Sequence, residues 1–132
     1  MPGGTRRPVI LVVEDELLIR KSALDFLEDA GFCVLEANNA LQGSAIFEER
    51  LDIGAIFTDI GIKAMFNGLI FAHLVSIRRP QVRVLVTSGS PRASVYSMPS
   101  NCRFLPKPYS PTCVTSALLG FTSAHPAVSA SI

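Results

Sequence analysis

Residues 9–15 of this 132-residue chain read Val-Ile-Leu-Val-Val-Glu-Asp, a run of five apolar side chains that ends on two acidic ones. Apolar runs of this length are typical of strands that are buried on both faces of a parallel sheet. Two later runs end on polar residues in the same way: residues 55–57 precede Thr58-Asp59, and residues 84–86 precede Thr87-Ser88. Since ligands bind at the carboxyl ends of parallel strands, the pattern predicts a polar site at one edge of a sheet.

A fourth and shorter apolar run, Phe104-Leu105, ends on Pro106-Lys107-Pro108 and adds an ammonium group to the same edge. Between the runs, apolar residues recur at helical spacing, Gly31 supplies a helix stop, and Asn38-Asn39 supplies a helix cap. We therefore predict strands at residues 9–13, 33–37, 55–58, 84–87 and 104–105, and helices at residues 16–30, 40–50, 68–79 and 111–119.

Alternating strands and helices of this kind indicate an α/β protein with a doubly wound five-stranded parallel sheet. Residues 89–102 are Ser-rich and lie around Pro91 and Pro99, so only a short helix of about two turns is expected there. We expect a flexible leader at residues 1–8, one domain at residues 9–119, and a disordered tail at residues 120–132.

Charge and cysteine content narrow the classes of partner and compartment. The 12 Lys and Arg residues nearly balance the 11 Asp and Glu residues, which disfavours a broad nucleic-acid-binding surface and favours a small molecule or a protein as partner. The three cysteines lack the spacing of a zinc site or a disulfide framework, and we expect them to be small apolar fillers. The first apolar run is too short for a signal peptide, so we expect a cytoplasmic protein with no membrane association.

Four segments, taken together, resemble the receiver domain of two-component response regulators. They are VILVVEDE (9–16), AIFTDI (55–60), VLVTSG (84–89) and FLPKPY (104–109), in the order and rough spacing of that family, and the resemblance runs from about residue 9 to residue 119. It implies a flavodoxin-like fold with strand order 2-1-3-4-5 and a Mg²⁺ cofactor. It also implies phosphorylation of one aspartate by a histidine kinase or a histidine phosphotransfer protein.

The resemblance assigns a role to each polar residue of the predicted edge. Asp59 matches the phosphoacceptor, Glu14 and Asp15 the acidic pair, Ser88 the switch hydroxyl, Lys107 the lysine, Phe104 the aromatic switch position, and the backbone carbonyl of Gly61 a metal ligand. Thr87 competes with Ser88 for the hydroxyl role, but in the family a small residue follows the hydroxyl, and Gly89 follows Ser88. The resemblance also predicts a cis Lys107-Pro108 peptide, since an X-Pro bond is the ordinary place for one.

The chemistry of these residue types agrees with the assignment. Three carboxylates at one edge repel one another unless a hard divalent cation lies among them, and Mg²⁺ takes oxygen ligands. We expect Asp15 and Asp59 to be direct ligands and Glu14 to act through water. Asp59 then attacks the phosphoryl group while Lys107 neutralises charge on its oxygens. We expect no metabolic turnover, only Mg²⁺-dependent self-phosphorylation and slow autodephosphorylation.

One segment departs from the family pattern. The loop after Asp59 keeps its usual length but lacks the usual proline, and Lys63 adds a cation near the acidic edge, so metal affinity is expected to suffer. Three alternatives stay open: the terminal receiver of a hybrid histidine kinase, a pseudo-receiver that is never phosphorylated, and a flavodoxin-like FMN enzyme, which the acidic end of the first strand disfavours. We expect the signal to pass to a protein partner through residues 89–119.

Overall fold

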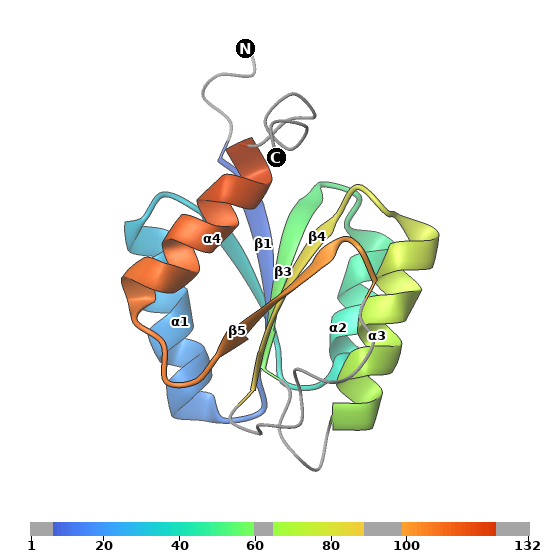
Figure 1. The fold of residues 1–132 in the computed structure, drawn as a ribbon, viewed down its shortest axis with the longest axis horizontal. Helices are drawn as coiled ribbons and strands as arrows, with labels where there is room; N and C mark the ends of the chain where they lie inside the picture. Colours follow the sequence, from blue (N-terminus) through green and yellow to red (C-terminus); the bar gives the residue numbers. More distant parts are fainter. Residues whose placement is uncertain (1–6, 60–64, 89–98, 124–132) are drawn as a thin grey trace.

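The computed structural model describes residues 7–59, 65–88 and 99–123, and in these residues five parallel strands form one sheet (Figure 1). The strands are β1 (Val9–Val13), β2 (Cys33–Ala37), β3 (Ile53–Asp59), β4 (Arg83–Ser88) and β5 (Cys102–Pro106). Their order is β2-β1-β3-β4-β5, and each neighbouring pair is parallel. The predicted fold class and strand order are therefore confirmed.

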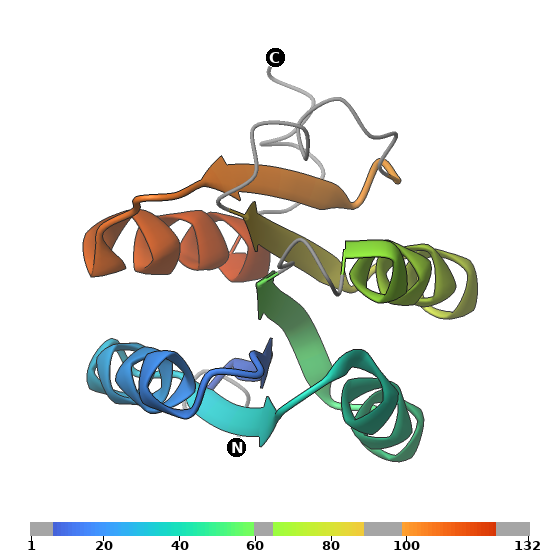
Figure 2. The same ribbon diagram turned by 90° about the horizontal axis from the view of Figure 1, so that it is seen from below.

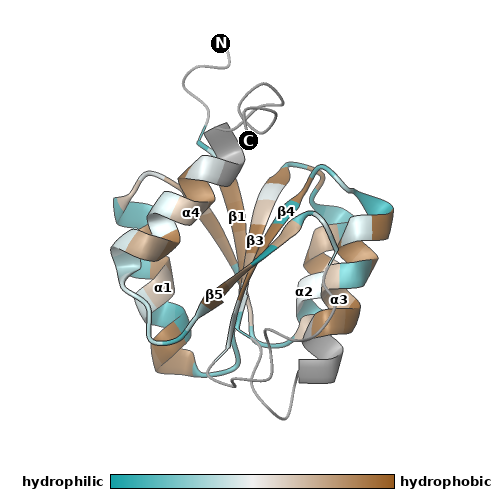
Figure 3. Cartoon of the chain, in the orientation of Figure 1, coloured by the Kyte–Doolittle hydropathy of each residue, from teal (hydrophilic) through white to brown (hydrophobic). Residues whose placement is uncertain are grey.

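Helices cover both faces of the sheet in two layers (Figure 2). On one face lie α1 (Leu17–Asp29) and α4 (Pro111–Ser123), and on the other lie α2 (Ala40–Glu49) and α3 (Met65–Arg78). Figure 3 shows that the strands between the layers are largely apolar. Among the described helices, none has the length and apolarity needed to cross a membrane.

The alternation of side chains along each strand divides the core into two apolar clusters. All five residues of β1 are buried, with Leu11 facing the α2 and α3 layer and Ile10 facing the α1 and α4 layer. This two-sided burial explains why β1 is an unbroken apolar run. It also means that the polar residue after each strand lies where the apolar sandwich ends.

Local signals set the end of α1 and the start of α2. Asn39 caps α2, because its side chain accepts a hydrogen bond of 2.7 Å from the backbone N–H of Gln42. Gly31, at φ 101°, follows the end of α1 in the left-handed region that favours glycine. Both signals were predicted, and β1 and β2 have the predicted bounds.

Other boundaries differ from the prediction. α3 begins at Met65 rather than at residue 68, and α4 runs to Ser123 rather than to residue 119, so four residues of the expected tail are helical. β3, β4 and β5 are each longer than their apolar runs, because the ladder continues wherever a neighbouring strand supplies partners: Ile53 pairs with Val9 beyond the apolar run of β3.

The cysteines differ from expectation in their burial. All three are free, but Cys33 and Cys113 are exposed, and only Cys102 is partly buried against the core. The prediction that they fill apolar space is therefore wrong for two of them. Cys33 begins the edge strand β2 and Cys113 lies in the first turn of α4, and both positions face solvent.

Candidate functional site

The carboxyl ends of four strands bring the predicted polar residues to one edge of the sheet, at the bottom of Figure 1. Glu14 directly follows β1, Asp59 ends β3, Ser88 ends β4, and Lys107 directly follows β5. The parallel register carries these residues to the same level, as the pairing of Asp59 with Thr87 and of Ser88 with Pro106 shows.

Lys107 and Asp59 form an ion pair at the centre of this edge. The Lys107 Nζ atom lies 2.6 Å from Asp59 Oδ2, and the two side chains are 31% and 11% exposed. The Lys107-Pro108 peptide is cis, as predicted. The backbone N–H of Lys107 also donates to the carbonyl of Ser88 at 3.2 Å, so the end of β5 is joined to the ends of both β3 and β4.

Glu14 is buried beside Asp59, with only 4% of its surface exposed. Its backbone N–H donates to the carbonyl of Ala37, and its Oε2 accepts a hydrogen bond of 2.9 Å from the backbone N–H of Glu16. Burial and then the nearby Asp59 side chain raise the pKa of Glu14 to about 8, against the opposing effect of the Glu16 N–H. The carboxyl groups of Glu14 and Asp59 therefore lie side by side in a poorly solvated environment.

The buried oxygens at this edge fit a divalent cation. Asp59 Oδ1 is buried and has no hydrogen-bond partner among the described residues. The other oxygen of the same carboxylate, Oδ2, accepts the hydrogen bond from Lys107. An unpaired carboxylate oxygen next to a carboxyl with a raised pKa is a poor arrangement for the protein alone. A hard cation that prefers oxygen ligands would satisfy both groups.

Asp15 lies on the solvent side of the acidic edge, and its predicted role as a direct metal ligand stays a prediction. It is exposed to solvent, and its side chain contacts Glu14, whose pKa it helps to raise. Glu14 thus contacts both Asp59 and Asp15, although within residues 7–59, 65–88 and 99–123 no three Asp, Glu, His or Cys side chains form a ready-made metal cluster. Gly61 and Lys63 lie outside the described residues, as do residues 89–98 of the expected partner surface.

The two candidate hydroxyl residues at the end of β4 are both buried. Alternation along the strand places Thr87 with Leu85, toward the α1 and α4 layer, and Ser88 with Val86, toward the α2 and α3 layer. The Thr87 Oγ1 atom has no hydrogen-bond partner among the described residues. Phe104 packs against the apolar cluster that contains Val86, on the α2 and α3 side. Ser88 is therefore the hydroxyl residue on the same side of the sheet as Phe104.

Phe104 is only partly buried in β5, and its neighbour in the register is Val86. The expected aromatic switch residue thus lies between the core and solvent, rather than in a fully exposed position. Its strand position relative to Ser88 agrees with the predicted coupling, which stays a prediction.

Tyr109 is a site residue that the sequence reasoning missed. With Glu14, Asp59 and Ile19 it lines a small depression at the edge, and its ring packs edge-on against Phe57 with the centroids 5.8 Å apart. Burial and then the charges of Asp59 and Glu14 raise the pKa of its phenol. The available signal was its place two residues after Lys107, directly beyond the cis proline.

Comparisons with known proteins agree with this architecture. The family profile described as the response regulator receiver domain matches residues 10–118. A response regulator receiver domain protein from Clostridium thermocellum is 23% identical, with a TM-score of 0.80 over 88% of this chain and 94% of that one. The receiver domain of the hybrid histidine kinase CckA is 24% identical, with a TM-score of 0.72 over 86% of this chain and 98% of that one.

A third similar structure is the response regulator TrrA from Thermotoga maritima in complex with Mg²⁺ and BeF. It is 16% identical, and its TM-score is 0.77 over 86% of this chain and 98% of that one. At identities of 16–24%, the structural likenesses show only the fold. The family is shown by the profile match, which covers residues 10–118.

Proposed function

Because the chain belongs to the response regulator receiver domain family, we propose that it receives a phosphoryl group on Asp59 and passes the signal to a protein partner. The observation that carries the proposal is the Asp59 carboxylate itself, which is mostly buried, is held by Lys107 at 2.6 Å, and lies beside Glu14 at the carboxyl edge of the sheet. The phosphodonor is a histidine kinase or a histidine phosphotransfer protein.

Asp59 and Lys107 divide the work of phosphoryl transfer. A carboxylate oxygen of Asp59 attacks phosphorus, the bond from phosphorus to the donor's leaving group breaks, and an acyl phosphate forms on Asp59. Lys107 holds one oxygen of the carboxylate and offers its ammonium to the arriving phosphoryl oxygens. The donor atoms of Glu14, Asp15 and Asp59, with the carbonyl of Gly61, would hold Mg²⁺, which when bound neutralises charge on the phosphoryl oxygens.

The start of α1 offers a docking surface for a protein phosphodonor. Leu17 and Leu18 are exposed there, within a few residues of the acidic edge. Leu18 also lines a shallow groove between α1 and α4, together with Ile19, Ser22, Phe26, Tyr109 and Pro111. An apolar surface that reaches Tyr109, a neighbour of Asp59, would seat a donor close to the carboxylate it must reach.

The outgoing signal is proposed to leave through residues 89–119, of which the structure describes residues 99–119, with β5 and most of α4. Ser88 moves toward the phosphoryl group, and Phe104 turns into the space behind it. The same chemistry applies if the chain acts as the receiver domain of a hybrid histidine kinase. The structurally similar CckA receiver domain comes from a kinase of that kind.

Mass spectrometry after incubation with acetyl phosphate and Mg²⁺ tests the proposal. The wild-type protein is expected to gain one phosphoryl group and Asp59→Asn none. Asp52→Asn is the matched control, because Asp52 is an exposed carboxylate in an ion pair with Arg50 and should leave labelling unchanged. No label on the wild-type protein, under conditions that label another receiver domain, would instead favour a pseudo-receiver.

A further inference from the structure

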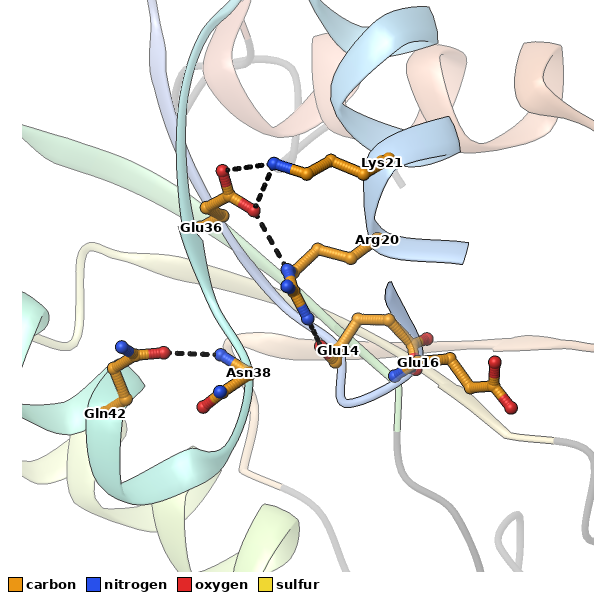
Figure 4. Close-up of polar contacts among 7 residues, drawn as sticks. All are labelled: Glu14, Glu16, Arg20, Lys21, Glu36, Asn38 and Gln42. Atoms are coloured by element: carbon orange, nitrogen blue, oxygen red, sulfur yellow. Dashed lines mark hydrogen bonds and ion pairs between the residues drawn. The ribbon is translucent and has the colours of Figure 1, made fainter. Parts of the chain in front are cut away.

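Arg20 joins three elements next to the acidic edge. It lies near the start of α1, and its side chain is 14% exposed. Its Nε donates to Oε1 of Glu36 in β2 at 2.9 Å, and its Nη1 donates to the backbone carbonyl of Glu14 at 2.9 Å (Figure 4). One guanidinium therefore connects the helix, the edge strand and the turn that carries Glu14 and Asp15.

The hydrogen bond to the Glu14 carbonyl fixes more than one atom. A peptide unit is planar, so the orientation of this carbonyl also sets the direction of the Asp15 N–H and the path of the chain into Asp15. The preceding N–H of Glu14 is held by the carbonyl of Ala37 at 3.0 Å. The Arg20 bond therefore restrains the carbonyl side of Glu14, which is the side that bears on Asp15.

Glu36 orients the guanidinium. The Glu36 carboxylate accepts hydrogen bonds from both Arg20 and Lys21. These bonds lower the pKa of Glu36, and the Arg20 bond has the larger effect. Lys21 is half exposed, and among the described residues its hydrogen bonds go to Glu36 and not to the Glu14 turn. The two cations therefore share an acceptor but differ in whether they reach the acidic edge.

An ammonium at position 20 could not take the same role. A guanidinium presents several N–H donors in a rigid plane, so Nε and Nη1 can bind a carboxylate and a carbonyl at the same time in fixed directions. A lysine has one compact donor group and would hold one of these partners at the expense of the other.

We propose that Arg20 is a positioning residue for the divalent-cation site, holding the Glu14-Asp15 peptide in the orientation that presents these carboxylates to the ion, with Glu36 as its orienting partner. The inference rests on the proposed function, because that function requires the cation. Substitution of residues that orient metal ligands commonly costs about 10- to 100-fold in metal affinity, so an effect of at least about tenfold is expected.

The test uses NMR on the full chain with three variants: Arg20→Met, Arg20→Lys and the control Lys21→Met. In EDTA, the carbonyl ¹³C shift of Glu14 should change in both Arg20 variants and not in Lys21→Met, which reports the lost hydrogen bond without any metal. Titration with Mg²⁺, followed through amide shifts of residues 14–16, should give affinities about tenfold weaker for Arg20→Met and clearly weaker for Arg20→Lys. The affinity of Lys21→Met should match the wild type.

The outcomes separate the two hypotheses. If the wild-type protein shows no Mg²⁺-dependent shifts, the proposed function fails and this inference fails with it. If the wild type binds and Arg20→Met binds equally well, only the inference is overturned. Wild-type Mg²⁺ affinity in Arg20→Lys would mean that charge alone matters and would also overturn the inference. If Arg20→Met does not fold, the Arg20→Lys variant decides the test.

Discussion

The Nζ atom of Lys107 lies 2.6 Å from Oδ2 of Asp59, although 48 positions separate the two residues and β4 lies between their strands in the sheet. The ion pair depends on the backbone at the end of β5, where the N–H of Lys107 donates to the Ser88 carbonyl. The lysine therefore neutralises the proposed phosphoacceptor and, through the same residue, contacts the strand end that carries the proposed switch hydroxyl.

Removing this ammonium should destabilise the protein in the absence of metal. Lys107→Met leaves the mostly buried Asp59 carboxylate without its cation, and hydrogen bonds to charged groups are worth about 1.5–3 kcal/mol, so a loss of this size is expected. Urea unfolding in EDTA measures it. Lys21→Met, which removes an exposed cation from Glu36, should cost less than about 1 kcal/mol. Equal losses in the two variants would show that the Lys107 pair has no special weight.

Glu14 should make the metal-free protein less stable as the pH rises. Its pKa is about 8 in the folded protein against 4.5 for an ordinary glutamate, so the folded state binds the proton more tightly. Both states are protonated at low pH, and stability is then lost as the pH rises from about 4.5 through about 8. Glu14→Gln should reduce this slope, measured as the free energy of unfolding in EDTA across that range.

Glu36→Gln provides the comparison of opposite sign. The pKa of Glu36 is lowered by Arg20 and then Lys21, so its contribution is present above its unfolded pKa and is lost as the pH falls. The two glutamine variants should therefore change the pH dependence in opposite directions. The assignment of the Glu14 shift would be wrong if Glu14→Gln left the slope between about pH 5 and pH 8 unaltered.

Thr87→Val should stabilise the protein. The Thr87 side chain is fully buried and its hydroxyl has no partner among the described residues, and valine has nearly the same shape without the polar atom. An unsatisfied buried hydroxyl costs about 1–3 kcal/mol, so a gain near the lower end is expected in the free energy of unfolding. A loss of stability would indicate that the hydroxyl has a hydrogen-bond partner beyond the described residues.

Beryllofluoride, which stands in for the phosphoryl group, should separate the roles of Thr87 and Ser88. With Mg²⁺ present, we expect large amide shifts in β5 around Phe104 and at the start of α4, and small ones in α2. Because a ligand shifts an equilibrium only through contacts that differ between the two states, Ser88→Ala should suppress the β5 response. Thr87→Val should leave it intact. Large shifts centred on α2, or a full response in Ser88→Ala, would contradict the proposed coupling.

Much of the fold could be predicted from local sequence. The bounds of β1 follow from its apolar run, the end of α1 follows from Gly31, and the start of α2 follows from Asn39, because glycine tolerates a positive φ and asparagine caps a free N–H. The strand order came from the resemblance to a family. The start of α3 at Met65 was missed, because the preceding loop lacks the family's proline and leaves no local signal for where the helix begins.

The sequence by itself determined which chemical groups meet at the carboxyl edge, since parallel strands that end on polar residues place them there whatever their order. Only the tertiary structure decided how each group is held: Glu14 is buried while its neighbour Asp15 is exposed, Arg20 reaches the Glu14 carbonyl, and Tyr109 packs beside Asp59. Successive side chains leave a strand in opposite directions, and burial at its end depends on residues from distant segments. Their positions are fixed by packing across the sheet, which no local pattern encodes.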